Sequence, residues 1–302
     1  ITIPAMKDEG YDPDYSAALA SAASLLGPMI PPSITLIVYA GLTDASVQKL
    51  FLATLTPAVV CTVAFLAYTL WYGKKKNLPK QPKKTLKEAG KIMLDAIWAL
   101  LLPVIVLGLI FSGITTVTEA AAISCLYSAI VSLFIYKTIT FKDLLKILGD
   151  SAVSIAAIMI LVGMSKATAY VVISSQMPQL FMGFITSFTS SRFVVLLILN
   201  LIFLLLGCLM EGNCIIVMMV PLLLTLVKSF GIDLLQFGVM AAINIYIGCI
   251  TPPVGVSLLL GSKLGKTSIG GTFKAILPFL GISMVILILV TYWPSFTLWL
   301  IH

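Results

Sequence analysis

Long apolar runs separated by short polar segments dominate the chain. Most runs are about 20 residues long, the length with which an α-helix crosses roughly 30 Å of hydrocarbon. They are continuous, whereas the strands of a membrane β-barrel alternate apolar and polar residues. We therefore predict an all-α, polytopic membrane protein. The expected apolar segments lie at about 16–42, 50–72, 92–113, 118–136, 152–173, 193–207, 214–227, 235–261 and 275–301.

The composition supports this class and excludes several kinds of enzyme. Of the 302 residues, 60% are hydrophobic and 10% are charged, and the mean hydropathy is +1.10, which is too apolar for a soluble surface. His302 is the only histidine, so the chain holds neither a histidine triad nor a HExxH zinc site. The five cysteines contain no CxxC pair, which argues against a disulfide framework. We predict no enzymatic activity and no organic cofactor.

A lysine-rich segment predicts the orientation in the membrane. Gly73 to Lys91 contains eight lysines and two prolines, and we expect it to be a soluble cytoplasmic linker. If 151–191 crosses once and 193–229 enters and returns from outside, three further segments lie inside: 5–14, 137–150 and 262–274. Fifteen of the 19 basic residues are then inside, as the positive-inside rule requires. The net charge of +7 thus reflects orientation and anionic lipid, and we expect no nucleic-acid partner.

The chain matches itself at an offset of 221 residues. The identities fall mainly on glycine, proline and aspartate, which are common where helices begin, end or are interrupted. In the predicted topology the first copy runs outward and the second inward, so the repeat is inverted. The matched pairs are Lys7 with Lys228, Gly10 with Gly231, Asp12 with Asp233, Gly27 with Gly248, Pro31 with Pro252, Pro32 with Pro253 and Pro57 with Pro278.

Each copy carries a motif that interrupts its helix, GPMIPPS at 27–33 and GCITPPV at 248–254. Two prolines remove two backbone donors and push the preceding residues out of the α region. We expect both helices to unwind near the middle of the membrane, as in transporters that bind substrate and coupling ions there. The freed carbonyls and the Thr251 hydroxyl suit Na⁺, and the helix N-termini suit an anion. The alternative is that each proline pair only kinks a structural helix.

A polar motif between two short apolar runs predicts a re-entrant hairpin. GCLMEGN at 207–213 places Glu211, Gly212 and Asn213 at the expected tip. Both flanking runs look too short for full spans. The alternative is an ordinary outer loop between two short spans. Because Ile1 to Met6 matches the exit arm of this hairpin and the chain opens without methionine, we expect it to be a fragment whose first hairpin begins before Ile1.

These motifs together resemble the large membrane subunit of the tripartite ATP-independent periplasmic (TRAP) transporters. The resemblance covers nearly the whole chain in order, and the two PP motifs with TEAAA between them are specific. Sodium-dependent dicarboxylate transporters share the broader plan, but their Ser-Asn-Thr motifs are not seen. The matching pieces are IPAMKDEGYDP (3–13), GPMIPPSITLIVYAG (27–41), TEAAA (118–122), GCLMEGN (207–213), VPLLL (220–224), GID (231–233) and IGCITPPVGVSLLL (247–260).

The resemblance implies a sodium-coupled elevator transporter in the bacterial inner membrane. It would import a small organic acid, such as sialic acid or a C4-dicarboxylate, delivered by a periplasmic binding protein, with a small membrane subunit that is separate or fused. The expected organisation is 1–72 with the end of the first hairpin, the first broken helix and a span; 73–91 as the linker; 92–191 as scaffold and arm helices; and 192–302 with the second hairpin, the second broken helix and the last span.

The predicted sites follow from these motifs. We expect Na⁺ to be held mostly by backbone carbonyls of the second break and, by pseudo-symmetry, of the first, with the hairpin tip closing the site. The substrate carboxylate should lie against the helix N-termini that follow the prolines. The candidate Na⁺ residues are Ser24, Gly27, Ile30, Glu211, Asn213, Gly248, Ile250 and Thr251. The candidate substrate residues are Ser33, Asn213, Asn244, Pro32 and Pro253.

Three other charged residues lie in or near apolar segments. Lys166 is a functional candidate by its expected depth, although snorkelling or pairing with another subunit is the favoured interpretation. We interpret Asp95 and Glu119 as structural, with Glu119 beginning a helix after Thr118. The competing functions are a binding-protein-independent sodium/dicarboxylate symporter, a channel, an intramembrane enzyme and a purely structural subunit.

Overall fold

The computed structural model describes residues 2–78 and 85–301, without the side chains of some residues in two helices, Lys166 among them. All regular elements in these ranges are helical, which confirms the all-α class. The first eight are α1 (Thr2–Asp8), α2 (Pro13–Ala23), α3 (Leu26–Met29), α4 (Ile34–Thr43), α5 (Val47–Lys75), α6 (Leu86–Ser112), α7 (Val117–Ile130) and the π-helix η1 (Val131–Ile135). They are followed by α8 (Phe141–Ser174), α9 (Met177–Phe188), α10 (Arg192–Leu209), α11 (Gly212–Ser229), α12 (Leu234–Cys249), α13 (Val256–Gly265), α14 (Ile269–Tyr292) and α15 (Pro294–Leu298).

Seven helical stretches of the described chain are long and apolar enough to cross a membrane. This confirms the polytopic prediction. The stretches are Pro13–Thr43, Val47–Lys75, Ile92–Ser112, Val117–Ile135, Arg192–Leu209, Gly212–Ser229 and Ile269–Tyr292.

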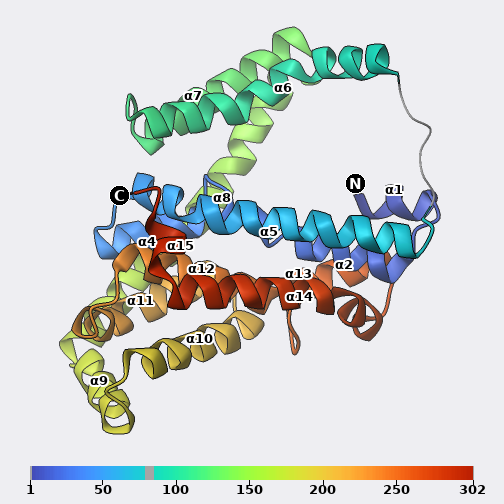
Figure 1. Ribbon diagram of the computed structural model, residues 1–302. Helices are drawn as coiled ribbons and strands as arrows, with labels where there is room; N and C mark the ends of the chain where they lie inside the picture. The colour runs from blue at the N-terminus through green and yellow to red at the C-terminus, as the bar shows by residue number, and fades with distance from the viewer. Residues whose placement is uncertain (1, 79–84, 302) are drawn as a thin grey trace. The chain divides into compact units, whose positions relative to one another are not determined.

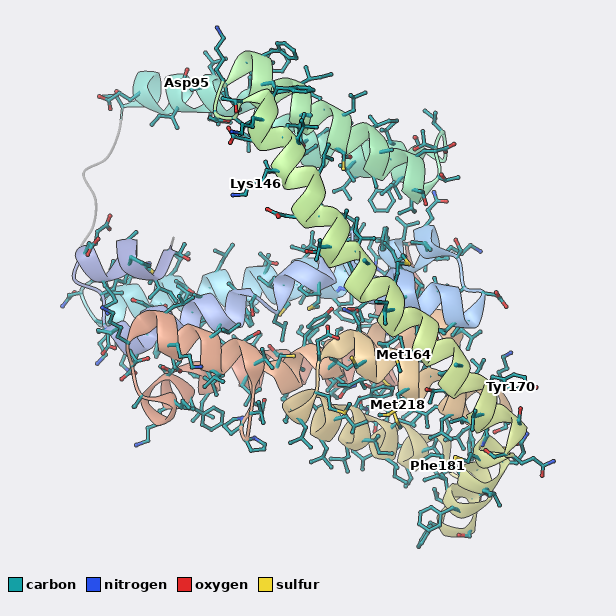
Figure 2. All side chains as sticks on the ribbon, turned by 180° about the vertical axis from the view of Figure 1, so that it is seen from behind. Asp95, Lys146, Met164, Tyr170, Phe181 and Met218 are labelled. Atoms are coloured by element: carbon teal, nitrogen blue, oxygen red, sulfur yellow. The ribbon has the colours of Figure 1, made fainter. Side chains whose placement is uncertain are left out.

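The chain divides into two compact units. The first, the repeat unit, contains Ile1–Pro79 and Met164–His302, and the second contains Lys80–Gly163. The boundary falls within α8, which leads through a tight turn into α9; Tyr170 and Phe181 mark these two helices in Figure 2. The second half of α8 and all of α9 therefore belong to the repeat unit in this division.

The second unit is built around the pair α6 and α7. The Tyr136 hydroxyl donates to the Asp95 carbonyl (2.8 Å), and Asp95 is labelled in Figure 2. The side chain of Glu119 accepts from the backbone N–H of Thr116 (2.7 Å), while the Thr116 hydroxyl accepts from Glu119 N–H. The N-cap of α7 is therefore Thr116, and the prediction of a helix start after Thr118 was wrong. Glu119 has the expected structural role, in a capping box.

Helix extends into both ends of the lysine-rich linker. α5 continues to Lys75, whose ammonium lies 4.7 Å from the centre of the Trp71 ring. α6 begins at Leu86, capped by Thr85. Lysine is a good helix former and interacts favourably with a helix C-terminus, so helix can continue into a segment that is predicted to be soluble and cytoplasmic. Residues 79–84 of that linker lie outside the described chain.

Four of the predicted pairs have the same backbone structure in both copies, which confirms the repeat. Asp12 caps α2 by accepting from the N–H groups two and three residues later, and Asp233 caps α12 in the same way. Gly10 and Gly231 both have positive φ, 83° and 61°. Both proline pairs are joined by cis peptide bonds.

The two copies run in opposite directions through the repeat unit. The Lys7 ammonium donates to the Gly265 carbonyl (2.8 Å), so the start of the first copy lies beside the end of the second. At the other end, the Tyr39 hydroxyl donates to the Leu234 carbonyl (2.6 Å). α2 packs along α13, and α4 packs along α11. This arrangement is the predicted inversion.

Two long helices brace the repeats on one side. α5 and α14 lie side by side (Figure 1), and the Phe279 ring meets Phe65 and Tyr68 edge to face. α14 ends at Tyr292 because Pro294 lacks an N–H and disfavours helix before it. The predicted last span to residue 301 was therefore too long. The short α15 turns back, and the Trp299 indole donates to the Thr56 hydroxyl (2.7 Å).

Candidate functional site

The first copy is interrupted over about ten residues. α2 ends at Ala23, the single turn α3 follows, and the backbone is extended at Ile30 and at Ser33, the N-cap of α4. The Ser24 hydroxyl donates to the Ser21 carbonyl (2.7 Å), one of the side-chain bonds that compete with helix. Among the described residues, nothing donates to the carbonyls of Ile30, Pro31 or Pro32. The predicted break is confirmed.

The second copy is interrupted between Cys249 and Val256. Gly255 closes the break with positive φ (51°). The Thr251 hydroxyl donates to the Ile247 carbonyl (2.7 Å), which leaves the hydroxyl oxygen available as an acceptor. No hydrogen bond from the described chain reaches the carbonyls of Thr251, Pro252 or Pro253.

The tip of the hairpin formed by α10 and α11 is capped by its own carboxylate. Glu211 accepts from the N–H groups of Asn213 (3.0 Å) and Cys214 (3.2 Å). It also accepts from the Asn213 side-chain amide (2.9 Å). A carboxylate at a helix N-terminus is stabilised by the helix dipole, so the tip is fixed by local contacts.

Glycine allows the tip to contact the second break. A Cβ on Gly248 would lie 2.4 Å from the carbonyl carbon of Gly207, and a Cβ on Gly207 would lie 2.7 Å from the Ile245 oxygen. The Gly255 N–H donates to the Cys208 carbonyl (3.2 Å). Since the break lies midway along the segment from α12 to α13, the hairpin ends at half the depth of that segment, as a re-entrant hairpin does.

The flanking helices are longer than the sequence indicated. α10 and α11 have 18 residues each, and each is long enough to count as a span. The hairpin was predicted because both apolar runs looked too short for full spans. That reason was wrong, because helix extends to within two residues of the tip. The position of the tip at the break carries the hairpin interpretation instead.

Polar contacts join the tip to both copies. The Thr35 hydroxyl, at the start of α4, donates to the Asn213 side-chain oxygen (3.0 Å). The same hydroxyl is hydrogen bonded to the Tyr246 hydroxyl on α12. Thr35 and Tyr246 were absent from the predicted site. Their only sequence signal is a hydroxyl within one or two turns of a proline pair.

A cavity of about 230 Å³ lies where these elements meet. A smaller one of about 190 Å³ adjoins it and shares Ser24 and Ser257. Glu211 is the one charged side chain among the described residues that line the larger cavity. The lining residues are Ser24, Leu25, Pro28, Glu211, Gly212, Tyr246, Cys249, Val256 and Ser257.

The predicted residues fall into two groups. Ser24 and Glu211 line the cavity, Asn213 lies beside Thr35, and the buried Ser33 caps α4. The others lie around the breaks without lining the cavity: Gly27, Ile30 and Pro32 are exposed, Pro253 is exposed, Gly248 and Ile250 are buried, and Thr251 is half-buried.

Asn244 is separated from the cavity. It is fully buried, and its side-chain amide donates to the Asn200 oxygen (2.6 Å) and to the Met240 carbonyl (2.8 Å). Asn200 in turn donates to the Thr291 hydroxyl (3.1 Å). In this structure Asn244 therefore contributes to the packing of α10, α12 and α14.

Oxygen atoms are the available ligands for a cation. Within the described residues, no group of three or more His, Cys, Asp or Glu side chains is arranged to hold a metal ion. Carbonyl, hydroxyl and amide oxygens suit a hard monovalent or alkaline-earth ion. The oxygen atoms around the breaks are thus of the chemical kind that ligates a small cation.

Comparison with known proteins gives a family match over residues 1–296, to the model described as tripartite ATP-independent periplasmic transporter, DctM component. The sialic acid TRAP transporter large permease protein SiaM of Vibrio cholerae is 33% identical over 99% of this chain and 70% of that protein. The C4-dicarboxylate TRAP transporter large permease protein DctM of Pseudomonas aeruginosa is 36% identical with the same coverage. The isethionate TRAP transporter permease protein DctMQ of Oleidesulfovibrio alaskensis is 33% identical over 98% of this chain and 47% of that protein.

Proposed function

This chain belongs to the DctM component family of the tripartite ATP-independent periplasmic transporters, and we propose that it is the large permease subunit of a sodium-coupled importer of a small organic acid. The family consists of transporter permease subunits of the bacterial inner membrane. Beyond the family assignment, we propose the coupling ion, the substrate class and an elevator movement.

The convergence of two broken helices and a hairpin tip on one cavity carries the proposal. Unpaired carbonyls in an apolar span are stable only beside protein, water or an ion. Here three carbonyls in each break are unpaired within the described chain. A structural kink would not require both breaks to lie beside a hairpin tip and a cavity, whereas a secondary transporter binds its ligands at such a junction.

We propose that Na⁺ binds at the second break. The donors would be carbonyls of Gly248, Ile250 and Thr251 and the Thr251 hydroxyl oxygen, which retains a free lone pair. The first break would supply a second, pseudo-symmetric site through Ser24, Gly27 and Ile30. Na⁺ is small and hard, so such oxygens hold it without a carboxylate ligand. The tip carboxylate of Glu211 adds negative charge nearby.

We propose that the substrate is a small carboxylate or sulfonate bound between the tip and α4. The names of the relatives specify sialic acid, C4-dicarboxylates and isethionate, all of which are organic anions. Among the described lining residues the cavity contains no lysine or arginine. The negative charge of the substrate would be balanced by the N-terminus of α4 and by the bound cation. Asn213, Thr35 and Tyr246 supply hydrogen-bonding groups.

The proposed partners are a periplasmic substrate-binding protein and a small membrane subunit. The family description specifies a tripartite and periplasmic system. One relative is named permease protein DctMQ, which supports a small subunit that is separate in some members and fused in others. The repeat unit, which contains both breaks and the hairpin, would be the part that moves in an elevator cycle.

Uptake into proteoliposomes tests the proposal. The full-length protein with its small subunit should accumulate the substrate against its gradient only with inward Na⁺ and with its binding protein present. Equal uptake without Na⁺ would refute sodium coupling. Uptake without the binding protein would indicate a sodium/dicarboxylate-type symporter, and flux that only dissipates gradients would indicate a channel.

A further inference from the structure

A third pocket lies at the far end of α10 from the hairpin tip. It has a volume of about 310 Å³ and is lined by Arg192, Phe193, Leu196, Thr291, Tyr292 and Pro294. We call it the Arg192 pocket. α10 has 18 residues, so roughly 27 Å of helix separates this pocket from the tip. In the predicted topology it lies at the periplasmic edge of the membrane.

The mouth of the Arg192 pocket is rich in donors. Arg192 is the only arginine in the chain, it is exposed, and its guanidinium can bind a phosphate with two parallel hydrogen bonds. The N-cap Ser191 makes no side-chain bond to α10. The first N–H groups of the helix, which begins at Arg192, therefore receive no side-chain cap from Ser191. No carboxylate occurs among the described residues that line this pocket, so an anion is favoured.

The walls of the pocket are apolar and continue along α10. The Phe193 and Tyr292 rings stack at 4.2 Å, and the Tyr292 hydroxyl donates to the Phe193 carbonyl (3.3 Å). Phe193 begins a ridge with a spacing of four residues, continued by Leu197, Leu201 and Leu205, and these side chains are 45–66% exposed. Neighbouring Trp293 is 56% exposed. Aromatic residues of this kind mark the boundary between headgroups and hydrocarbon.

We propose that the Arg192 pocket binds one membrane phospholipid, with its phosphate at Arg192 and an acyl chain along the ridge from Phe193 to Leu205. A soluble anion would use the guanidinium and would leave the ridge without a role. A phospholipid uses both the guanidinium and the ridge. Its charged headgroup and its acyl chains are separated along the membrane normal, and so are Arg192 and the leucines of the ridge. The lipid would bridge the first arm of the hairpin to the end of α14.

Lipid retention tests the proposal on the purified full-length protein with its small subunit. We would measure phospholipid bound after extensive detergent washing, by native mass spectrometry, and the thermal shift on adding back phosphatidylglycerol. Arg192→Gln should weaken phospholipid binding by roughly ten- to hundred-fold, the effect of losing charge-assisted hydrogen bonds. Arg192→Lys keeps the charge but cannot form the two parallel hydrogen bonds, so it should weaken phospholipid binding by an intermediate amount.

Lys228→Gln is the matched control. Lys228 is an exposed cation near the end of α11, on the same predicted side of the membrane. The Lys228→Gln substitution removes one positive charge, as Arg192→Gln does, and should leave phospholipid retention unchanged. Equal retention in wild type and Arg192→Gln would overturn the proposal. So would an equal thermal shift with inorganic phosphate, since that result would assign the pocket to a free anion. Leu201→Ser, which shortens the ridge, should weaken phosphatidylglycerol binding and leave any phosphate effect unchanged.

Discussion

Replacing Gly248 by alanine tests whether the hairpin tip and the second break form one packed junction. The added Cβ would lie 2.4 Å from the carbonyl carbon of Gly207, 2.6 Å from its Cα and 2.7 Å from the Cys208 nitrogen. All three are backbone atoms, so no side-chain rotation can relieve the overlap. α10 and α12 must move apart, and overpacking of this kind costs typically 1–3 kcal/mol.

A cost of about 2 kcal/mol would reduce the equilibrium constant for closing the junction by roughly 30-fold. In domains of 150–250 residues, each kcal/mol lowers the unfolding temperature by roughly 2–4 °C. We therefore expect Gly248→Ala to lower it by about 4–8 °C. It should also raise the Na⁺ concentration for half-maximal uptake, because the carbonyls of the break move with the helix.

The repeat supplies the matched control. Gly27 is the pseudo-symmetric partner of Gly248, and a Cβ there would meet nothing within 4 Å. Gly27→Ala, measured on this same chain by thermal unfolding, should be neutral or slightly stabilising, since alanine favours helix over glycine by up to about 1 kcal/mol. Equal destabilisation by both substitutions, or a neutral Gly248→Ala, would refute the packed junction.

Three further predictions concern single side chains. Thr251→Val removes the hydroxyl and keeps the shape, so it should raise the Na⁺ concentration for half-maximal uptake, while Thr251→Ser should not; equal sodium dependence in all three proteins would place the ion elsewhere. Cys249 lines the cavity, so a small thiol reagent should modify it and block uptake, with protection by substrate; modification unaffected by saturating substrate would count against the cavity. Glu88 accepts hydrogen bonds from the Thr85 backbone and hydroxyl, which lower the pKa of its carboxyl. The stabilisation of the start of α6 should therefore be present above the ordinary carboxyl pKa and lost as pH falls through the lower folded value. Hydrogen exchange of that turn, corrected for intrinsic rates, should show this pH dependence in wild type and not in Glu88→Gln.

The breaks and the repeat could be predicted from the sequence because their signals are local. A proline pair disrupts a helix wherever it stands, and Asp12 and Asp233 cap the residues directly after them. Helix ends were less accurate. Apolar runs end where polar residues begin, whereas helix continues through lysines such as Lys75 as long as the backbone bonds are made.

Long-range contacts decided the rest of the site. Thr35 forms hydrogen bonds with partners 178 and 211 residues away, and the sequence around Thr35 does not predict them. Asn244 shows the converse case. A lone amide in an apolar helix suggests a ligand, but here the Asn244 NH₂ group donates to the Asn200 oxygen, 44 residues away, while the buried Asn244 oxygen has no partner within the described chain. Two amides that bond each other inside a membrane have the same local sequence signal as two that await a substrate.

The matched caps of the two copies have a consequence for how the chain enters the membrane. Asp12 and Asp233, Gly10 and Gly231, and the two proline pairs form the same backbone structure although the copies cross in opposite directions. Local folding information is thus independent of direction. The decision about which end of each copy is translocated must come from outside the repeated motifs, and the lysines of 73–91 are placed to supply it. In the predicted topology, the lysines would thus direct insertion and the repeated motifs would direct local folding.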